Sequence, residues 1–144
     1  MKILTNSERQ TFNLGKKLAS KLQGGEVLAL NGQLGAGKTV LIKGIAAGLG
    51  IKHIITSPTF VIMKVYKSGA RGQGLGVRNL VHIDCYRVKD PQAIAGIGVA
   101  DYFGQKDTVT VIEWADYIKK LLPKKRMNIA IKLKSLNKRE ITIQ

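Results

Sequence analysis

Hydrophobic and polar positions along the chain follow helical spacing in some segments and strand-like spacing in others. Small and apolar side chains recur every three or four positions over residues 6–23, which predicts an amphipathic helix. Thr5 and Glu8 have the spacing of a capping box at its start. An apolar run at 26–30 predicts a buried strand, and a glycine-rich turn and a second helix at about 38–49 follow it. This order is the opening of a βαβ unit.

Strand-like patterns dominate the rest of the chain. The expected strands are 60–66, 80–83, 109–112, 128–133 and 140–143, and the last two form a terminal hairpin. The glycine-rich segment 68–77 is expected to be a loop between two antiparallel strands, and 116–122 predicts a short helix. We therefore expect an α/β fold in which a mostly parallel sheet is flanked by helices and extended by antiparallel strands. A single domain should span residues 1–144.

Composition supports a soluble globular protein. Of the 144 residues, 44% are apolar and 23% are charged, values typical of such domains. Uncharged stretches such as 27–37 and 44–51 are too short to span a bilayer, and polar residues interrupt the N-terminal segment before a signal peptide could form. The single cysteine, Cys85, excludes an internal disulfide and suits a reducing compartment. We expect a cytoplasmic protein without membrane contact.

The charge balance is unusual. Lysine and arginine number 24 against 9 acidic residues, which gives a net charge of +15. Such an excess favours polyanionic partners: nucleic acid, nucleotide phosphates or an acidic protein face. The tract 119–139 contains nine basic residues and no acidic one. A solvated basic face explains this tract equally well, so charge alone does not identify a function.

Residues 32–39, with the sequence Gly-Gln-Leu-Gly-Ala-Gly-Lys-Thr, fit the phosphate-loop pattern at every position. Glycines allow successive backbone amides to turn inward and surround phosphates at a helix N-terminus. Lys38 would place a positive charge on the β- and γ-phosphates, and Thr39 would offer a hydroxyl to Mg²⁺. The expected strand before the loop and helix after it complete the context. The sequence therefore predicts a nucleotide-binding P-loop.

Two carboxylates lie where a P-loop site needs them. Asp84 follows the strand 80–83 and Glu113 follows the strand 109–112, so both should emerge at the carboxyl edge of the sheet. Either could hold the metal directly or through water, and an ordinary strand-end acid is the alternative for each. Thr59 could be a switch-type hydroxyl that senses the γ-phosphate.

Other candidate residues carry weaker signals. His82 is expected to be structural, and Cys85 to be a small buried residue. Trp114 favours core packing over stacking on a ligand or partner. The sequence contains no Cys/His cluster of the kind that holds a structural metal.

Four motifs in this order resemble the TsaE family of small bacterial P-loop ATPases, and the resemblance covers nearly the whole chain. The motifs are residues 32–39, Ser57-Pro58-Thr59-Phe60, His82-Ile83-Asp84-Cys85-Tyr86-Arg87 and Val111-Ile112-Glu113-Trp114. The resemblance implies a P-loop NTPase core that binds and hydrolyses ATP, slowly when alone. It also implies partners, TsaB and TsaD, with which the assembly transfers a threonylcarbamoyl group onto adenosine 37 of tRNA. TsaE-like proteins support repeated turnovers and do not transfer the group themselves.

The resemblance also implies roles for individual residues. Lys38, Asp84 and Glu113 would be catalytic, Thr39 and Glu113 would hold Mg²⁺, and Asp84 would act through a metal-bound water or polarise the attacking water. The nucleotide would contact Ser7, Gly35, Ala36, Gly37, Lys38, Thr39, Val40, Thr59, Asp84, Trp114 and Arg139. Tyr86 and Arg87 would face the partner proteins. Two departures from the family stand out: residues 92–97 lack its usual glutamates, and the glycine-rich loop is longer and more basic.

Two other functions are compatible with a P-loop. A small-molecule or nucleotide kinase usually needs a lid with paired arginines, whereas the central loop offers only Arg71 and Arg78. A nucleotide-gated RNA-binding module could use the 119–139 tract on the phosphate backbone, although the tract lacks interleaved aromatic residues for base stacking. This last function is compatible with the first if tRNA passes near the tract.

Overall fold

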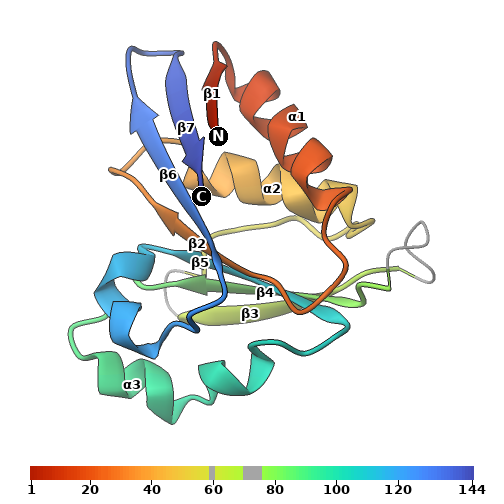
Figure 1. Ribbon diagram of the computed structural model, residues 1–144, viewed down its shortest axis with the longest axis vertical. Coiled ribbons are helices and arrows are strands. Elements are labelled where there is room, and N and C mark those ends of the chain that lie inside the picture. The colour runs from red at the N-terminus through yellow and green to blue at the C-terminus, as the bar shows by residue number, and fades with distance from the viewer. Residues whose placement is uncertain (59–60, 70–75) are drawn as a thin grey trace.

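The computed structural model describes residues 1–58, 61–69 and 76–144, and within them the chain forms one mixed sheet between two layers of helices (Figure 1). The sheet order is β1-β7-β6-β2-β5-β4-β3. The strands are β1 (Lys2–Thr5), β2 (Val27–Asn31), β3 (Met63–Lys67), β4 (Asn79–Asp84), β5 (Thr108–Glu113), β6 (Met127–Leu133) and β7 (Arg139–Ile143). The helices are α1 (Glu8–Ala19), α2 (Lys38–Gly48) and α3 (Pro91–Gly96), with 3₁₀ helices η1 (Val99–Tyr102) and η2 (Ala115–Leu121).

The centre of the sheet is parallel. Strand β2 pairs in parallel with β5 and β6, and β4 pairs in parallel with β5, whereas β1, β3 and β7 join in antiparallel pairs. The expected α/β architecture is confirmed. In the β4–β5 register Asp84 lies opposite Glu113, so the two strand-end acids are neighbours at the carboxyl edge.

Helices α1 and α2 cover one face of the sheet and pack closely against each other (Figure 1). Glycines allow this approach because a side chain would fill the contact. A Cβ on Gly44 would lie 2.0 Å from the carbonyl oxygen of Phe12, and one on Gly15 would lie 2.3 Å from that of Leu41. Gly15, one of the small residues in the helical pattern over 6–23, therefore lies at a close helix–helix contact.

The other helical layer covers only part of the opposite face. Ile94 of α3 and Ile118 of η2 pack with Val27, Val81 and Ile112 from the parallel strands β2, β4 and β5. The strands β1, β7 and β6 contribute their buried residues to the cluster under α1 and α2 instead. None of the helices among the described residues is both long and apolar enough to cross a membrane.

The chain start differs from the sequence-based prediction. Thr5 ends β1, a strand that was not predicted, and its hydroxyl lies 2.8 Å from that of Thr11. Ser7 caps α1 by accepting a hydrogen bond from the backbone of Gln10, and the Gln10 side chain accepts one from Asn6. The predicted capping box at Thr5 and Glu8 was therefore wrong by two residues. The cause is long-range: β1 pairs with β7, which fixes Thr5 in extended backbone.

The helix expected at 116–122 is also different in kind. It forms as the 3₁₀ helix η2, and its backbone leaves the helical region at Ile118. Ile118, the residue at this break, is fully buried in the cluster on that face of the sheet.

The contact between α1 and α2 predicts a large effect of one methyl group. Gly44→Ala should lower the free energy of unfolding by about 3 kcal/mol, because the added carbon meets backbone atoms that must shift. Urea denaturation followed by circular dichroism measures this change.

Gly96→Ala is the matched control. Gly96 is also helical, and nothing lies within 4 Å of its added carbon, so this variant should gain about 0.5 kcal/mol. Equal stabilities of the two variants would contradict the close helix contact.

Candidate functional site

The glycine-rich loop between β2 and α2 forms the floor of the candidate site. Gly32, Gly35 and Gly37 have backbone φ values of 156°, 75° and 103°, which side chains rarely adopt. Gly37 begins α2 in the left-handed conformation without a side-chain cap, so the first amides of the helix remain available to an anion. This local geometry is what the glycine spacing of a phosphate loop predicts.

Lys38 lies across this loop. Its ammonium donates hydrogen bonds to the carbonyl oxygens of Gly32, at 2.7 Å, and Gln33, at 3.1 Å. The same nitrogen is 4.0 Å from the ring centre of Trp114, a cation–π contact. Burial lowers the pKa of Lys38 below its ordinary value, while the negative charges of Glu113 and Asp84 act in the opposite direction. The ammonium is therefore held in place by two carbonyls and an aromatic face, within the electrostatic field of two carboxylates.

Glu113 is buried at the centre of the site and accepts hydrogen bonds from two directions. The Thr39 hydroxyl lies 3.1 and 3.3 Å from its two carboxylate oxygens. The Nε2 atom of His82 lies 2.9 Å from Oε1. His82 is fully buried, and its Nδ1 atom has no hydrogen-bond partner among the described residues. A bare Nδ1 is least costly without a proton, so we assign the proton to Nε2, which donates to Glu113.

His82 therefore supports the site from behind, in keeping with the structural role expected from the sequence: its ring holds Glu113 and is not in the described lining of the cavity. The signal that could have identified it is its position two residues before Asp84 on the same strand. Alternate strand residues point to the same face, and β4 lies beside β5, so His82 and Glu113 can meet across the pair.

Asp84 is held by its neighbours in the chain and by a residue far from it in sequence. Its Oδ2 atom accepts a hydrogen bond from the Ser57 hydroxyl, and its Oδ1 atom accepts one from the Tyr86 amide at 2.9 Å. Ser57, from the second motif, therefore lies at the site beside Asp84, whereas Thr59 lies outside the described residues. The next residue, Cys85, is buried as expected, and its pKa is raised to about 12 by burial and the Asp84 charge.

Trp114 is not a simple core residue. Its backbone φ of 56° is in the left-handed region, and its ring is 4.9 Å from Tyr86 and nearly parallel to Tyr117 at 6.0 Å. Tyr86 and Tyr117 are exposed, so the three rings form a partly solvent-accessible cluster beside Lys38. The expectation that core packing dominates at Trp114 is corrected to a position at the edge of the site.

Arg139 supports the loop from the terminal hairpin. The guanidinium is buried, donates through Nε to the Ala36 carbonyl at 3.1 Å, and lies 3.6 Å from the Glu8 carboxylate. A Cβ on Gly37 would lie 2.8 Å from Nε, so this glycine makes room for the arginine. The Ser7 hydroxyl instead accepts a hydrogen bond from the Gln10 backbone and so caps α1.

Many of these residues line a cavity of about 400 Å³, within the range of small-molecule sites, whereas Ser7, His82 and Arg139 are not in its described lining. Its described lining comprises Glu8, Leu34, Gly35, Gly37, Lys38, Thr39, Val40, Ser57, Asp84, Tyr86, Arg87, Glu113 and Trp114. Hydroxyl and carboxylate oxygens are the ligands that Mg²⁺ prefers, so Thr39 and Glu113 fit that ion. No cluster of three or more His, Cys, Asp or Glu side chains that could hold a metal occurs in the described ranges. A P-loop Mg²⁺ takes its other ligands from phosphates and water.

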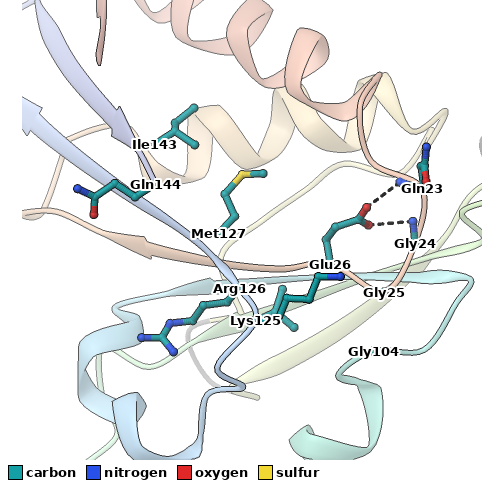
Figure 2. Close-up of a pocket in the computed structure, with 11 residues that line it drawn as sticks. Gln23, Gly24, Gly25, Glu26, Gly104, Lys125, Arg126, Met127, Ile143 and Gln144 are labelled. Atoms are coloured by element: carbon teal, nitrogen blue, oxygen red, sulfur yellow. Dashed lines mark hydrogen bonds between the residues drawn. The ribbon is translucent and has the colours of Figure 1, made fainter. Parts of the chain in front are cut away.

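A larger cavity, of about 660 Å³, opens at the opposite edge of the sheet (Figure 2). Glu26 lies in its wall, and both of its carboxylate oxygens accept hydrogen bonds from the backbone of the turn, from Gln23 at 2.9 Å and Gly24 at 2.8 Å. This carboxylate fixes the turn between α1 and β2. The glycines, lysine and threonine that a phosphate site needs lie at the carboxyl edge of the sheet, in the smaller cavity.

Comparisons with known proteins all point to one family. A family model described as "Threonylcarbamoyl adenosine biosynthesis protein TsaE" matches residues 5–141. A Bacillus subtilis protein named tRNA threonylcarbamoyladenosine biosynthesis protein TsaE is 40% identical over 142 residues, covering 99% of this chain and 84% of that protein. A Treponema pallidum protein of the same name is 35% identical over 144 residues and 99% of each chain. The crystal structure of YdiB from Bacillus subtilis superposes with a TM-score of 0.79 at 38% identity, covering 99% of this chain and 83% of that one.

The buried pair of His82 and Glu113 predicts an energetic coupling in the protein without nucleotide or metal. A double-mutant cycle with His82→Leu and Glu113→Ala should give about 1–3 kcal/mol, the cost of a lost hydrogen bond to a buried carboxylate. Urea denaturation in the presence of a chelator measures it, because the chelator removes any contribution from bound metal.

His82→Gln tests the same contact by rescue. A glutamine amide can donate a hydrogen bond from about the position of Nε2, so this variant should lose less stability than His82→Leu. A coupling energy near zero, or equal losses in both His82 variants, would contradict the proposed hydrogen bond.

Proposed function

This chain belongs to the TsaE family, and from that premise we propose that it binds and hydrolyses ATP with Mg²⁺ in support of tRNA threonylcarbamoyladenosine biosynthesis. The observation that carries the proposal is the meeting of Lys38, Thr39 and Glu113 at the start of α2, directly after the glycine loop. In this proposal TsaB and TsaD are partners that carry out the transfer to adenosine 37, and the work takes place in the cytoplasm. Residues 1–144 act as one domain, because the site draws on residues from Glu8 to Arg139.

Lys38 can bind phosphate without leaving its present position. An ammonium has three protons, and carbonyl oxygens of the loop accept two hydrogen bonds from this one. A third proton is available for the β- and γ-phosphates. The loop amides between Gly35 and Val40 would surround the same oxygens.

Thr39 and Glu113 fit the role of Mg²⁺ ligands. The Thr39 hydroxyl donates its proton to Glu113, so its oxygen lone pairs are directed away from the carboxylate and remain available. His82 holds Glu113 from the other side and keeps the carboxylate oriented when Thr39 shifts. Bound Mg²⁺ would neutralise charge that builds up between the β- and γ-phosphates.

Asp84 is positioned to polarise the attacking water or a metal-bound water. Hydrogen bonds from Ser57 and Tyr86 fix both of its oxygens, yet each oxygen keeps a lone pair for a water proton. Trp114 and Arg139 would contact the nucleotide from the two sides of the loop, and Ser7 and Thr59 would complete the contacts.

Family membership favours this function over the kinase considered from the sequence. The curated relatives carry a name from tRNA modification, and they match along almost the whole chain.

Tyr86 and Arg87 border the cavity in this structure and would face the partner proteins.

Lys38→Ala should weaken ATP binding by about 2–3 kcal/mol, because the variant loses a charge-assisted contact to phosphate. Phosphate release from ATP, alone and with the TsaB–TsaD pair, measures the consequence. We expect the pair to stimulate the wild-type protein strongly and to leave the variant inactive. Lys43→Ala, which removes an exposed lysine from the same helix, is the control and should behave as wild type. Hydrolysis that ignores the pair would contradict the partner assignment, and unchanged ATP affinity in Lys38→Ala would contradict the P-loop assignment.

Glu113→Ala should separate metal-dependent from metal-free binding. Hydrolysis in Mg²⁺ should fall by about a hundredfold, roughly 3 kcal/mol, because a metal ligand is lost. ATP binding in a chelator should change much less, and calorimetry measures both conditions. Asp101→Ala, at an exposed carboxylate of η1, controls for the loss of charge. Equal losses with and without Mg²⁺ would refute the role of Glu113 as a metal ligand.

A further inference from the structure

One face of the β1-β7-β6 part of the sheet is open to solvent. Ile129, Ile131 and Ile141 point toward α1 and α2, where they are buried. Since strand residues alternate between faces, Lys132 and Glu140 point to the other side. On β1 the exposed Lys2 and Leu4 share that side, because Ile3 packs toward the helices.

The 3₁₀ helix η2 extends the same side of the molecule. Its buried residues Ala115 and Ile118 pack on Val27 and Ala29, on the sheet face opposite α1 and α2. The exposed lysines of η2 and of the segment after it therefore border the open strands. We name these side chains the lysine face: Lys2, Lys119, Lys120, Lys124, Lys125, Lys132 and Lys134.

The lysine face has little internal neutralisation. Glu140 is the acid among its described strand residues, and it lies 3.7 Å from Lys2 and 3.6 Å from Lys134 in exposed pairs that are worth little. Asp116 of η2 instead contacts Asn31 at the end of β2. Arg139, which belongs to the basic tract by sequence, is buried at the P-loop and is not part of this face. Lys2, which is outside the tract, is part of it.

We propose that the lysine face binds the sugar–phosphate backbone of folded RNA. Lysines are flexible point charges that bind phosphates without requiring a fixed base geometry. Tyr117 of η2 stacks on Trp114 beside Lys38, so the lysine face as defined consists of point charges. This inference rests on the proposed function, in which tRNA is the molecule being modified, and it predicts binding that does not depend on base sequence.

The position of the face connects RNA to the nucleotide site. The helix η2 begins directly after Trp114, whose ring lies over Lys38. At the other end of the face, Lys125 and Arg126 line the second cavity (Figure 2), and Arg126 donates a hydrogen bond to Asn128 of β6. Positive charge therefore continues from the neighbourhood of the ATP site to the opposite edge of the sheet.

The test compares two sets of four exposed lysines changed to glutamine, each lowering the net charge from +15 to +11. The probes are an unmodified tRNA transcript and an unrelated RNA hairpin, titrated at several salt concentrations. The face variant changes Lys2, Lys120, Lys132 and Lys134. The matched control changes Lys16, Lys17, Lys21 and Lys43, which are exposed on α1, the turn after it and α2.

We expect the face variant to bind both RNAs at least about tenfold more weakly, with the slope of log affinity against log salt reduced by about four. The control variant should keep nearly the wild-type slope. Equal losses in both variants would mean that net charge alone attracts RNA, and this would overturn the proposal. No loss in the face variant, no RNA binding at low salt, or binding of anionic lipid vesicles in place of RNA would also overturn it.

A second measurement needs no variant. Bound RNA should protect Lys132 and Lys134 of the wild-type protein from acetylation and leave Lys16 and Lys17 reactive. Uniform protection, or none, would contradict the face.

ATP hydrolysis by both variants separates this inference from the proposed function. The changed lysines lie outside the nucleotide cavity, so hydrolysis without RNA should stay at the wild-type level. If the wild-type protein does not bind RNA while its hydrolysis and its stimulation by TsaB and TsaD persist, the lysine face is refuted and the ATPase assignment stays intact.

Discussion

The buried carboxylate of Glu113 is the group on which the arrangement of the site depends. A charge at this depth is stable only because the structure provides partners for it: the Thr39 hydroxyl, the His82 ring and the nearby Lys38 ammonium. Two of these partners, Lys38 and Thr39, come from α2, and His82 comes from β4. The P-loop helix and the two central strands are therefore coupled through one side chain, and the geometry of the anion site follows from that coupling.

The two helical layers cover the two faces of the sheet to different extents. Under α1 and α2, close glycine contacts and a continuous apolar cluster hold the loop and the terminal hairpin together. Arg139 links the hairpin to the loop by donating hydrogen bonds to the Ala36 and Asn137 carbonyls and pairing with the Glu8 carboxylate. On the opposite face, α3 and η2 cover only the parallel strands β2, β4 and β5. The side chains of β1, β6 and β7 on that face are open to solvent. The same sheet thus serves as a scaffold on one face and as a surface on the other.

Much of this structure was predictable from the sequence because its signals are local. Glycine spacing around Lys38, the apolar runs that become β2, β4 and β5, and acids directly after two strands each report on a few neighbouring residues. What could not be predicted depends on distant contacts. The strand β1 exists because β7 pairs with it, the role of His82 depends on the β4–β5 register, and Arg139 reaches the loop only through the folded hairpin. The basic surface could not be predicted from the tract 119–139 either, because Arg139 is buried in the fold whereas Lys2, which lies outside the tract, is on that surface.

The contact between Trp114 and Lys38 also gives the protein its own optical reporter. The chain has one tryptophan, so all indole fluorescence comes from a ring whose centre is 4.0 Å from the P-loop ammonium. Its emission is sensitive to nearby charge and to the tyrosines on either side of it. Tyr86 lies on one side of the Trp114 ring and Tyr117, at the start of η2, lies on another. A structural change at the loop or at the start of η2 should therefore change the same fluorescence signal. Occupancy of the cavity beside Lys38 can therefore be followed in unlabelled protein and in real time.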